Sequence, residues 1–342
     1  MHLHLSRRHF IQQLCAAAAL TSPLLGLTAA LPRAQLRASS LRFQFEPLVD
    51  LYFLLRTGTD RGEILPPEWR PALDRMKAAA DYLPGGGGLD VLNGLIAESG
   101  SVAELSRVVA GMPSTVAGRA PVREALEAVA DALGMAQPLY AQGIGATRRE
   151  LVMEATAQRI DRVLVPGERE CLTYILSGLE LPDRDFEVPV FLVANAPEPG
   201  SITGRSRRLT TACFVSVGAY PGSTLLEVIL HEATHALEVA AGPDSGSVLD
   251  RLRAGLQAQG VKATDPLMRD VPHTLMFVHS GETVRRALDP THIDYGDSQG
   301  YYAKVPDVAS VVRTHWMDQL NGQLSTNMAI DRMVAGVLKQ AG

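Results

Sequence analysis

The chain has few aromatic residues, few cysteines and no basic segment, and these shortages argue against several classes of function. Phe, Trp and Tyr together make up 5% of the 342 residues, which disfavours a stacking platform for nucleic-acid bases. The formal net charge is −5, without a long run of Lys or Arg, so the electrostatic footprint of a nucleic-acid-binding protein is absent. We therefore expect no nucleic-acid partner.

The three cysteines, Cys15, Cys171 and Cys213, form no CxxC pair. Cysteine thiolates are therefore not expected to make a metal site in this protein. Cys15 belongs to the N-terminal segment considered next. For Cys171 and Cys213, a disulfide and two buried free thiols both stay open, because the sequence does not give the distance between them.

The first 34 residues contain no Asp or Glu and predict an export signal rather than part of a fold. A basic start is followed by an apolar stretch over 11–31 and then by small residues. The string Ser6–Ile11 resembles the twin-arginine signal, in which paired arginines, here Arg7 and Arg8, precede a bulky apolar residue. The apolar stretch is also long enough for a membrane anchor, an alternative that Pro23 and several polar residues weaken. We expect an exported, periplasmic or cell-envelope protein that contacts the membrane only through an uncleaved signal.

The whole chain has the composition of a globular protein, with 46% hydrophobic and 20% charged residues, and its length favours two units. Helical periodicity dominates to about residue 165. The segments 186–193 and 209–217 are rich in β-branched and aromatic residues and predict strands. The sequence thus predicts an α+β, predominantly helical fold. A helical domain is expected over 40–170, followed by a second domain over 171–342 that contains the small β-sheet.

The six histidines beyond the N-terminal segment all lie between residues 231 and 315, and His231 and His235 are four residues apart. A capping box formed by Thr224 and Glu227, followed by Gly242-Pro243, predicts one helix over about 225–241. The two histidines then share a face, one turn apart, where two imidazoles can bind one metal ion. The helix is apolar nearly all round and should be buried, so its imidazoles need a metal or backbone partners.

The string His231-Glu232-Ala233-Thr234-His235 matches the HExxH motif of zinc metallopeptidases, and Zn²⁺ is the cofactor that it implies. Glu232 follows the first ligand and is rotated about 100° from it around the helix, so it lies beside the metal without being a ligand. A carboxylate in this place can take a proton from a metal-activated water and deliver it to a leaving amine. We therefore predict Glu232 as the catalytic base.

Zinc needs a further protein ligand, and the sequence favours Glu282. A second helix is predicted from about Pro272 to Asp289-Pro290, with Leu275 and Val278 on the face of Glu282, so this carboxylate should point inward. The preceding Gly281 allows a metal or another backbone to approach closely. An HExxH helix followed by a Gly–Glu helix resembles the gluzincins, in which a downstream glutamate completes the site. The thermolysin pattern has an Asp four residues after that glutamate, where this chain has Arg286.

Other assignments around the site stay open. Ala241 stands where the metzincin pattern has its third histidine, so that pattern is excluded. An ion pair with Arg285 or Arg286 is the alternative role for Glu282. Tyr301 and Tyr302 follow a glycine in a predicted loop and are candidates for stabilising a tetrahedral oxyanion, with packing or surface positions as the alternative. The remaining candidates for the third ligand are His279, Glu238, His273, His292 and Asp294.

Together these residues predict an exported zinc-dependent hydrolase, a peptidase acting on a peptide or protein substrate. The resemblance implies a zincin-like catalytic domain. One alternative is a non-catalytic envelope protein with structural zinc, since binding by both His279 and Glu282 would close the site against water. Another is a zinc amidohydrolase that acts on a non-peptide substrate.

Overall fold

The computed structural model describes residues 40–341 except 62–64, 83–88, 90–91, 112–121, 198–200, 205–210 and 243, so the predicted export signal lies outside the described residues. Among the described helices, none combines the length and the apolar character that a membrane span requires. The chain divides into two compact units. The sheet unit consists of Leu41–Ala157 and Glu187–Tyr220, and the histidine unit consists chiefly of Gln158–Phe186 and Pro221–Gly342.

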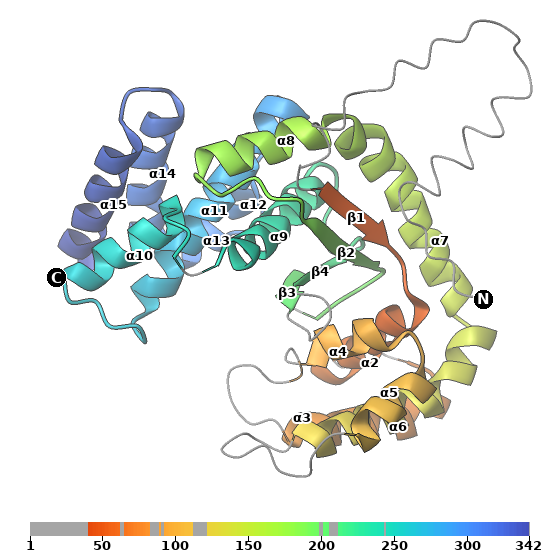
Figure 1. The fold of residues 1–342 in the computed structure, drawn as a ribbon. Helices are drawn as coiled ribbons and strands as arrows, with labels where there is room; N and C mark the ends of the chain where they lie inside the picture. The colour runs from red at the N-terminus through yellow and green to blue at the C-terminus, as the bar shows by residue number, and fades with distance from the viewer. Residues whose placement is uncertain are drawn as a thin grey trace, which may run out of the picture. The chain divides into compact units, whose positions relative to one another are not determined.

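The sheet unit contains a four-stranded sheet in the order β1-β2-β4-β3 (Figure 1). Strand β2 pairs in parallel with β4, with Val190 opposite Cys213, and β3 pairs antiparallel with β4. The predicted strands are confirmed over slightly shorter ranges, and both are buried along nearly their whole length, which explains their almost continuous apolar sequences. The four strands are β1 Ser40–Gln44, β2 Glu187–Val193, β3 Ser201–Gly204 and β4 Ala212–Ser216.

Helices pack on this sheet and build the core of the sheet unit. Helix α2 lies against β2, and the ring of Phe53 contacts that of Phe214, which stacks on Phe191. The remaining helices of the unit extend this core, with α3 against α6 and α5 against α6. The helices are α2 Pro47–Arg61, η2 Pro67–Trp69, α3 Arg70–Asp81, α4 Asn93–Ser99, α5 Val102–Ala110, α6 Val122–Gln142 and α7 Gly145–Ala155.

A fully buried carboxylate, Asp50, connects the elements of the sheet unit. It accepts hydrogen bonds from the Tyr140 hydroxyl at 2.7 Å, from two nitrogens of the Arg148 guanidinium at 2.6 and 3.0 Å, and from the Ala194 N–H at 2.7 Å. These donors come from α6, from α7 and from the residue after β2, so one side chain on α2 links three other parts of the unit. The buried charge is fully compensated by protein groups, and we assign Asp50 to the fold rather than to catalysis.

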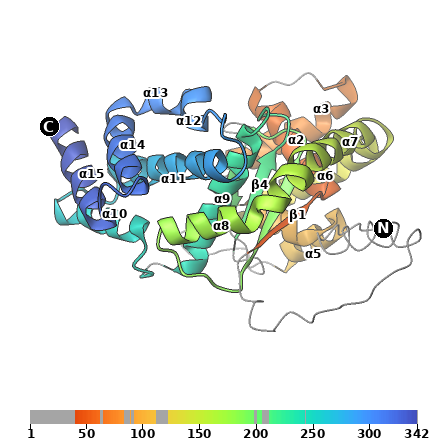
Figure 2. The ribbon, with the colours of Figure 1, turned by 90° about the horizontal axis from the view of Figure 1, so that it is seen from above.

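The histidine unit is entirely helical in its described part apart from loops. Helix α11 is central to it, since α8, α9, α10 and α14 all pack against this helix (Figure 2). A π-helical stretch, η4 Thr156–Leu164, runs into α8. The helices are α8 Val165–Gly178, α9 Thr224–Ala241, α10 Val248–Ala258, α11 Pro266–Ala287, α12 Tyr295–Ser298, α13 Tyr301–Lys304, α14 Pro306–Leu320 and α15 Thr326–Ala341.

The α+β, predominantly helical class is confirmed, but the strands group differently from the expectation. The prediction placed the sheet with the histidine-rich helices, beyond a single boundary near residue 170. In the structure the sheet belongs with the N-terminal helices, because α2 and α7 pack on β2. The segment that carries α8 groups instead with the C-terminal helices. Each unit is therefore built from two separate stretches of chain.

Cys171 and Cys213 are both free thiols, so the disulfide alternative does not apply. Both side chains are fully buried, Cys171 on α8 and Cys213 on β4. Burial is the main reason why the pKa of the Cys171 thiol rises to about 12. A thiol in this state is a poor nucleophile and a poor metal ligand, so we treat Cys171 as part of the core.

Candidate metal centre

The helix that carries the HExxH string, α9, covers almost the range predicted for it and is buried over most of its length. It ends before Gly242, whose φ of 88° lies in the left-handed region that glycine tolerates. The predicted capping box is wrong. Ser223 occupies the N-cap without a side-chain hydrogen bond, and the Glu227 carboxylate turns instead to His292 and to the backbone of Tyr295.

The second helix, α11, begins earlier than predicted. Asp265 caps it by accepting a hydrogen bond from the Leu267 N–H at 2.9 Å, with Pro266 in the first helical position. Pro272, the predicted start, lies inside the helix. His273 is consequently two turns into α11, with a fixed direction, rather than at its frayed end.

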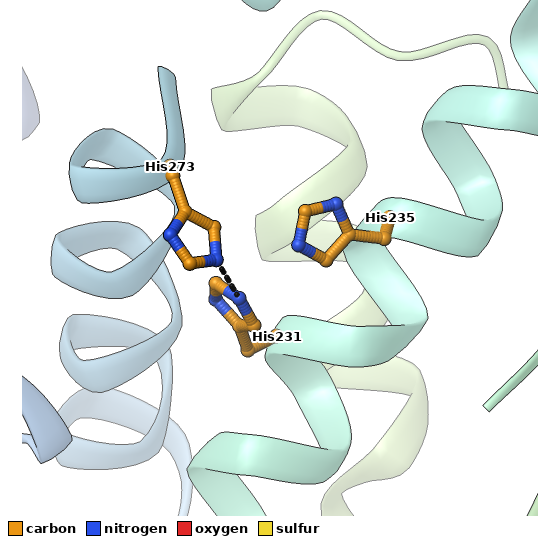
Figure 3. A group of neighbouring side chains, drawn as sticks. All are labelled: His231, His235 and His273. Carbon is orange, nitrogen blue, oxygen red and sulfur yellow. Dashed lines mark hydrogen bonds between the residues drawn. The ribbon is translucent and has the colours of Figure 1, made fainter. Parts of the chain in front are cut away.

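The structure brings three histidines together: His231 and His235 from α9, and His273 from α11 (Figure 3). Their rings point toward one another across the space between the two helices. The Nε2 atoms of His231 and His273 are 3.1 Å apart. One nitrogen from each ring can be chosen so that all three atoms lie within 4.8 Å of one another. The three side chains are thus placed closely enough to hold a metal ion.

This cluster fits a cation of the size of Zn²⁺. Metal–nitrogen bonds of about 2.0–2.1 Å in a tetrahedral site separate the nitrogens by about 3.3 Å, close to the observed distance between His231 and His273. His231 is 2% exposed, and its Nε2 faces another ring nitrogen, His273 Nε2, so a cation between the two could be bound by both.

The electrostatics of the cluster favour neutral imidazoles, the form that binds metals. Burial is the main cause of the lowered pKa of each ring, which is well below the ordinary value for His231, about 3 for His235 and about 4 for His273. The neighbouring histidines lower the pKa of His231 and His235 further, because two charged imidazoles side by side repel one another.

Glu232 is buried in the middle of α9, with 6% of its surface exposed. It directly follows His231 and is therefore rotated about 100° from that ring around the helix. Glu232 thus lies on a rigid helix beside a candidate ligand in sequence, and its role as catalytic base stays a prediction.

The two predicted tyrosines have different surroundings. The Tyr301 hydroxyl lies 3.3 Å from His273 Nδ1 and 3.3 Å from Thr274 Oγ1, and its ring meets that of His273 edge-on. Tyr301 therefore contacts the histidine cluster through His273. The Tyr302 ring packs on Gly296 and under the Arg313 guanidinium, 4.6 Å from the ring centre, so the structure places it in packing rather than among the histidines.

The structure does not bring Glu282 to the cluster, which corrects the predicted third ligand. Nine residues separate it from His273, which places the two side chains about 180° apart around α11. Glu282 is buried, as predicted, but its carboxylate accepts hydrogen bonds from Arg285 and Arg286, one helical turn further on. Two guanidinium groups thus compensate its charge, and the ion-pair alternative applies.

The space beside Gly281 is occupied by Asp294 and Glu227 rather than by a metal site. A Cβ atom at this position would lie 2.6 Å from the Asp294 Cβ and 3.3 Å from Glu227 Oε1. The glycine therefore lets the segment after α11 come close to the helix. Glu238, another alternative ligand, pairs with Arg253.

His279 is a core histidine rather than a ligand. Its Nε2 lies 3.3 Å from the Tyr174 carbonyl, its Nδ1 accepts a hydrogen bond from Trp316 Nε1 at 3.3 Å, and its ring stacks on that of Tyr174. Gly178 passes directly over the ring, since a Cβ there would lie 2.3 Å from His279 Cε1. Burial lowers the pKa of His279 to about 4, so the ring is neutral in the folded protein near pH 7.

Because His279 is neutral in the folded protein, we expect the protein to lose stability in acid. The contribution of His279 is the difference between the wild type and His279→Gln. Because the folded pKa of about 4 lies below the unfolded value of about 6.5, the unfolded chain binds more protons in between, and the stabilisation present above pH 6.5 is lost as the pH falls. Between pH 7 and pH 5 the wild type should lose about 2 kcal/mol more than His279→Gln, measured by urea unfolding at each pH. Equal losses would show that His279 is not held neutral.

Sequence reasoning missed His273 as the leading third ligand, although a signal for it was present. Asp265-Pro266 is a helix-start signature that lengthens α11 by nearly two turns upstream of Pro272. His273 then stands four residues before Phe277, so the two share a face of α11. The Phe277 ring in turn stacks on that of His231, with ring centres 3.8 Å apart.

Comparison of the chain with protein-family models, with curated proteins and with solved structures found no match.

Proposed function

We propose that the protein is a zinc-dependent hydrolase, a peptidase that acts on a peptide or protein substrate. The single observation that carries this proposal is the convergence of His231 and His235, from an HExxH helix, with His273 from a second helix. Three protein ligands are the number found at catalytic zinc sites, whereas structural sites have four. The N-terminal segment, with its twin arginines, supports export to the periplasm or cell envelope.

Each residue around the cluster can have its own role in hydrolysis. A metal ion held by the three imidazoles would supply Lewis acidity toward a carbonyl and an acidified water. Glu232 takes up a proton and passes it to the leaving amine, since it is an acid next to a ligand on the same helix. The Tyr301 hydroxyl lies 3.3 Å from His273 Nδ1, whereas His273 Nε2 is the nitrogen that faces His231, so Tyr301 would orient this ligand rather than meet an oxyanion at the metal.

The placement of the other candidates favours a catalytic over a structural site. A closed site would need His279 and Glu282 as additional ligands. His279 is held by Tyr174 and Trp316, and Glu282 by two arginines. The three candidate ligands are all histidines, unlike the two histidines and one glutamate of a gluzincin, so the proposal is a zincin-like enzyme with a different third ligand.

Removal and return of the metal tests this function. The purified chain should contain about one zinc ion, because one histidine cluster is present in the described structure. Dialysis against a chelator should abolish cleavage of a labelled casein, and added Zn²⁺ should restore it. Assays with small amide substrates, run in parallel, separate a peptidase from an amidohydrolase. Cleavage that persists without metal, or a zinc-loaded chain that hydrolyses neither substrate class, would contradict the proposal.

A further inference from the structure

A buried pair of side chains joins the ligand helix to the segment that follows α11. The Glu227 carboxylate lies one turn before His231 on α9, and its Oε2 accepts hydrogen bonds from His292 Nε2 at 2.7 Å and from the Tyr295 N–H at 2.6 Å. The other ring nitrogen of His292 lies 2.9 Å from Ser223 Oγ. The side chains of Glu227 and His292 are 0% and 1% exposed, so this contact is made away from water.

The same segment presents aromatic rings to the metal cluster. Tyr295, whose backbone Glu227 holds, stacks on Phe277 with ring centres 4.8 Å apart and ring planes 8° apart. Phe277 stacks on His231 at 3.8 Å and 13°. A continuous stack of three rings thus runs from the anchored segment to a candidate ligand. Further along the segment, the Tyr301 hydroxyl contacts His273 Nδ1 and its ring contacts Phe277.

The backbone of α11 is shaped for this close approach. Gly281 lies where a Cβ would collide with the Asp294 Cβ at 2.6 Å and approach Glu227 Oε1 to 3.3 Å. Asp294 itself caps the short helix α12 by accepting a hydrogen bond from the Asp297 N–H at 2.9 Å. The segment is therefore fixed both at the buried pair and at its own helix start, and both fixed points, His292 and Asp294, lie shortly before Tyr295.

We propose that Glu227 and His292 are positioning residues for the metal centre, which hold the segment 289–301 so that its aromatic rings fix the orientation of His231 and His273. This role rests on the proposed metal binding and adds to it two residues outside the HExxH string. Neither residue touches the cluster directly; each acts through Tyr295 and Phe277. These residues increase the metal affinity by holding the ligand rings in place before the metal binds. A ring that is free to rotate must lose that freedom on binding, which weakens the affinity.

Metal affinity, measured separately from stability, tests the positioning role. Zinc affinity is determined by competition with a chromophoric chelator, and the ligand geometry is followed in the absorption spectrum of the Co²⁺-loaded protein. Glu227→Ala should weaken zinc binding by about 10-fold to 100-fold and change the cobalt spectrum, since partners that orient ligands typically contribute this much. Glu227→Gln keeps an oxygen acceptor for His292 and Tyr295, so it should restore most of the affinity.

Trp316→Phe is the matched control. It removes a buried hydrogen bond to His279, which lies on the same helix as His273 but outside the ring stack. This variant should lose thermal stability, yet keep the zinc affinity of the wild type. If Glu227→Ala and Trp316→Phe weaken zinc binding equally, or if neither does, the positioning role is wrong.

Tyr295→Leu provides a second test in case Glu227→Ala does not fold. It leaves the buried pair and the Tyr295 N–H in place and removes only the ring that stacks on Phe277. Weaker zinc binding and an altered cobalt spectrum support the path through the rings, and unchanged values contradict it. A wild-type chain that binds no zinc would overturn the proposed function as well, whereas a zinc-binding wild type with unaffected variants would overturn only the positioning role.

Discussion

Replacing His273 by alanine is expected to lower the zinc affinity by at least about a hundredfold, whereas Glu282→Gln should leave it unchanged. His273 contributes one of the three nitrogens that converge between α9 and α11, and its Nε2 lies 3.1 Å from that of His231. Two histidines alone hold zinc weakly because water must fill the remaining positions. Glu282 interacts with Arg285 and Arg286 instead.

Zinc content after dialysis against a weak chelator, followed by competition titration, measures both effects. Glu282→Gln should unfold more easily than the wild type, since it leaves two arginines without their carboxylate, and it therefore also controls for general destabilisation. If His273→Ala keeps its full zinc content and Glu282→Gln loses zinc, the third ligand is Glu282 and not His273.

The choice between these two ligands shows where sequence reasoning reached its limit. Glu282 was correctly expected to be buried, on the strength of the apolar residues Leu275 and Val278. A helix, however, has several buried faces when it lies at the centre of a bundle, as α11 does. Burial therefore did not identify the face that meets α9, and the start of α11 was needed to place His273.

Local signals predicted other elements well. The end of α9 agrees with the prediction because an apolar run is closed by a glycine in the left-handed region, and its start agrees to within one residue although the capping box that predicted it does not form. Strand β2 was likewise found from its Val and Phe content. Helix α6 runs to Gln142 with Pro138 in its interior, against the usual tendency of proline to end a helix.

Long-range relations were not accessible from the sequence. The sheet groups with the N-terminal helices because α2 and α7 pack on β2, a contact between residues far apart in the chain. Glu227 illustrates the same limit within one side chain. Its spacing from Thr224 suggested a capping box, but the partner that satisfies it, His292, is 65 residues away. Glu227 thus binds a buried histidine that is distant in the chain, and the local capping interaction does not form.

The all-histidine ligand set has a consequence for the base. Three neutral imidazoles leave the charge of a bound divalent cation uncompensated, whereas a glutamate ligand would neutralise part of it. Lowering of the pKa of bound water to about 7 is known for a three-histidine zinc site. In the proposed mechanism Glu232 is the carboxylate nearest in sequence to the cluster, and proton transfer through it is the step that a substitution would remove.

Glu232→Gln is accordingly expected to lower the rate of peptide hydrolysis by about 10²-fold to 10⁴-fold while zinc remains bound. The amide keeps the size of the side chain, and both histidines of α9 keep their places, but no group is left that can accept and return the proton. Casein cleavage, with zinc content measured on the same samples, checks both halves of the expectation. Glu238→Gln is the matched control, because it changes a glutamate of the same helix that pairs with Arg253 and should leave the rate within about twofold. A zinc-loaded Glu232→Gln variant that cleaves at the wild-type rate would show that proton transfer does not depend on this carboxylate.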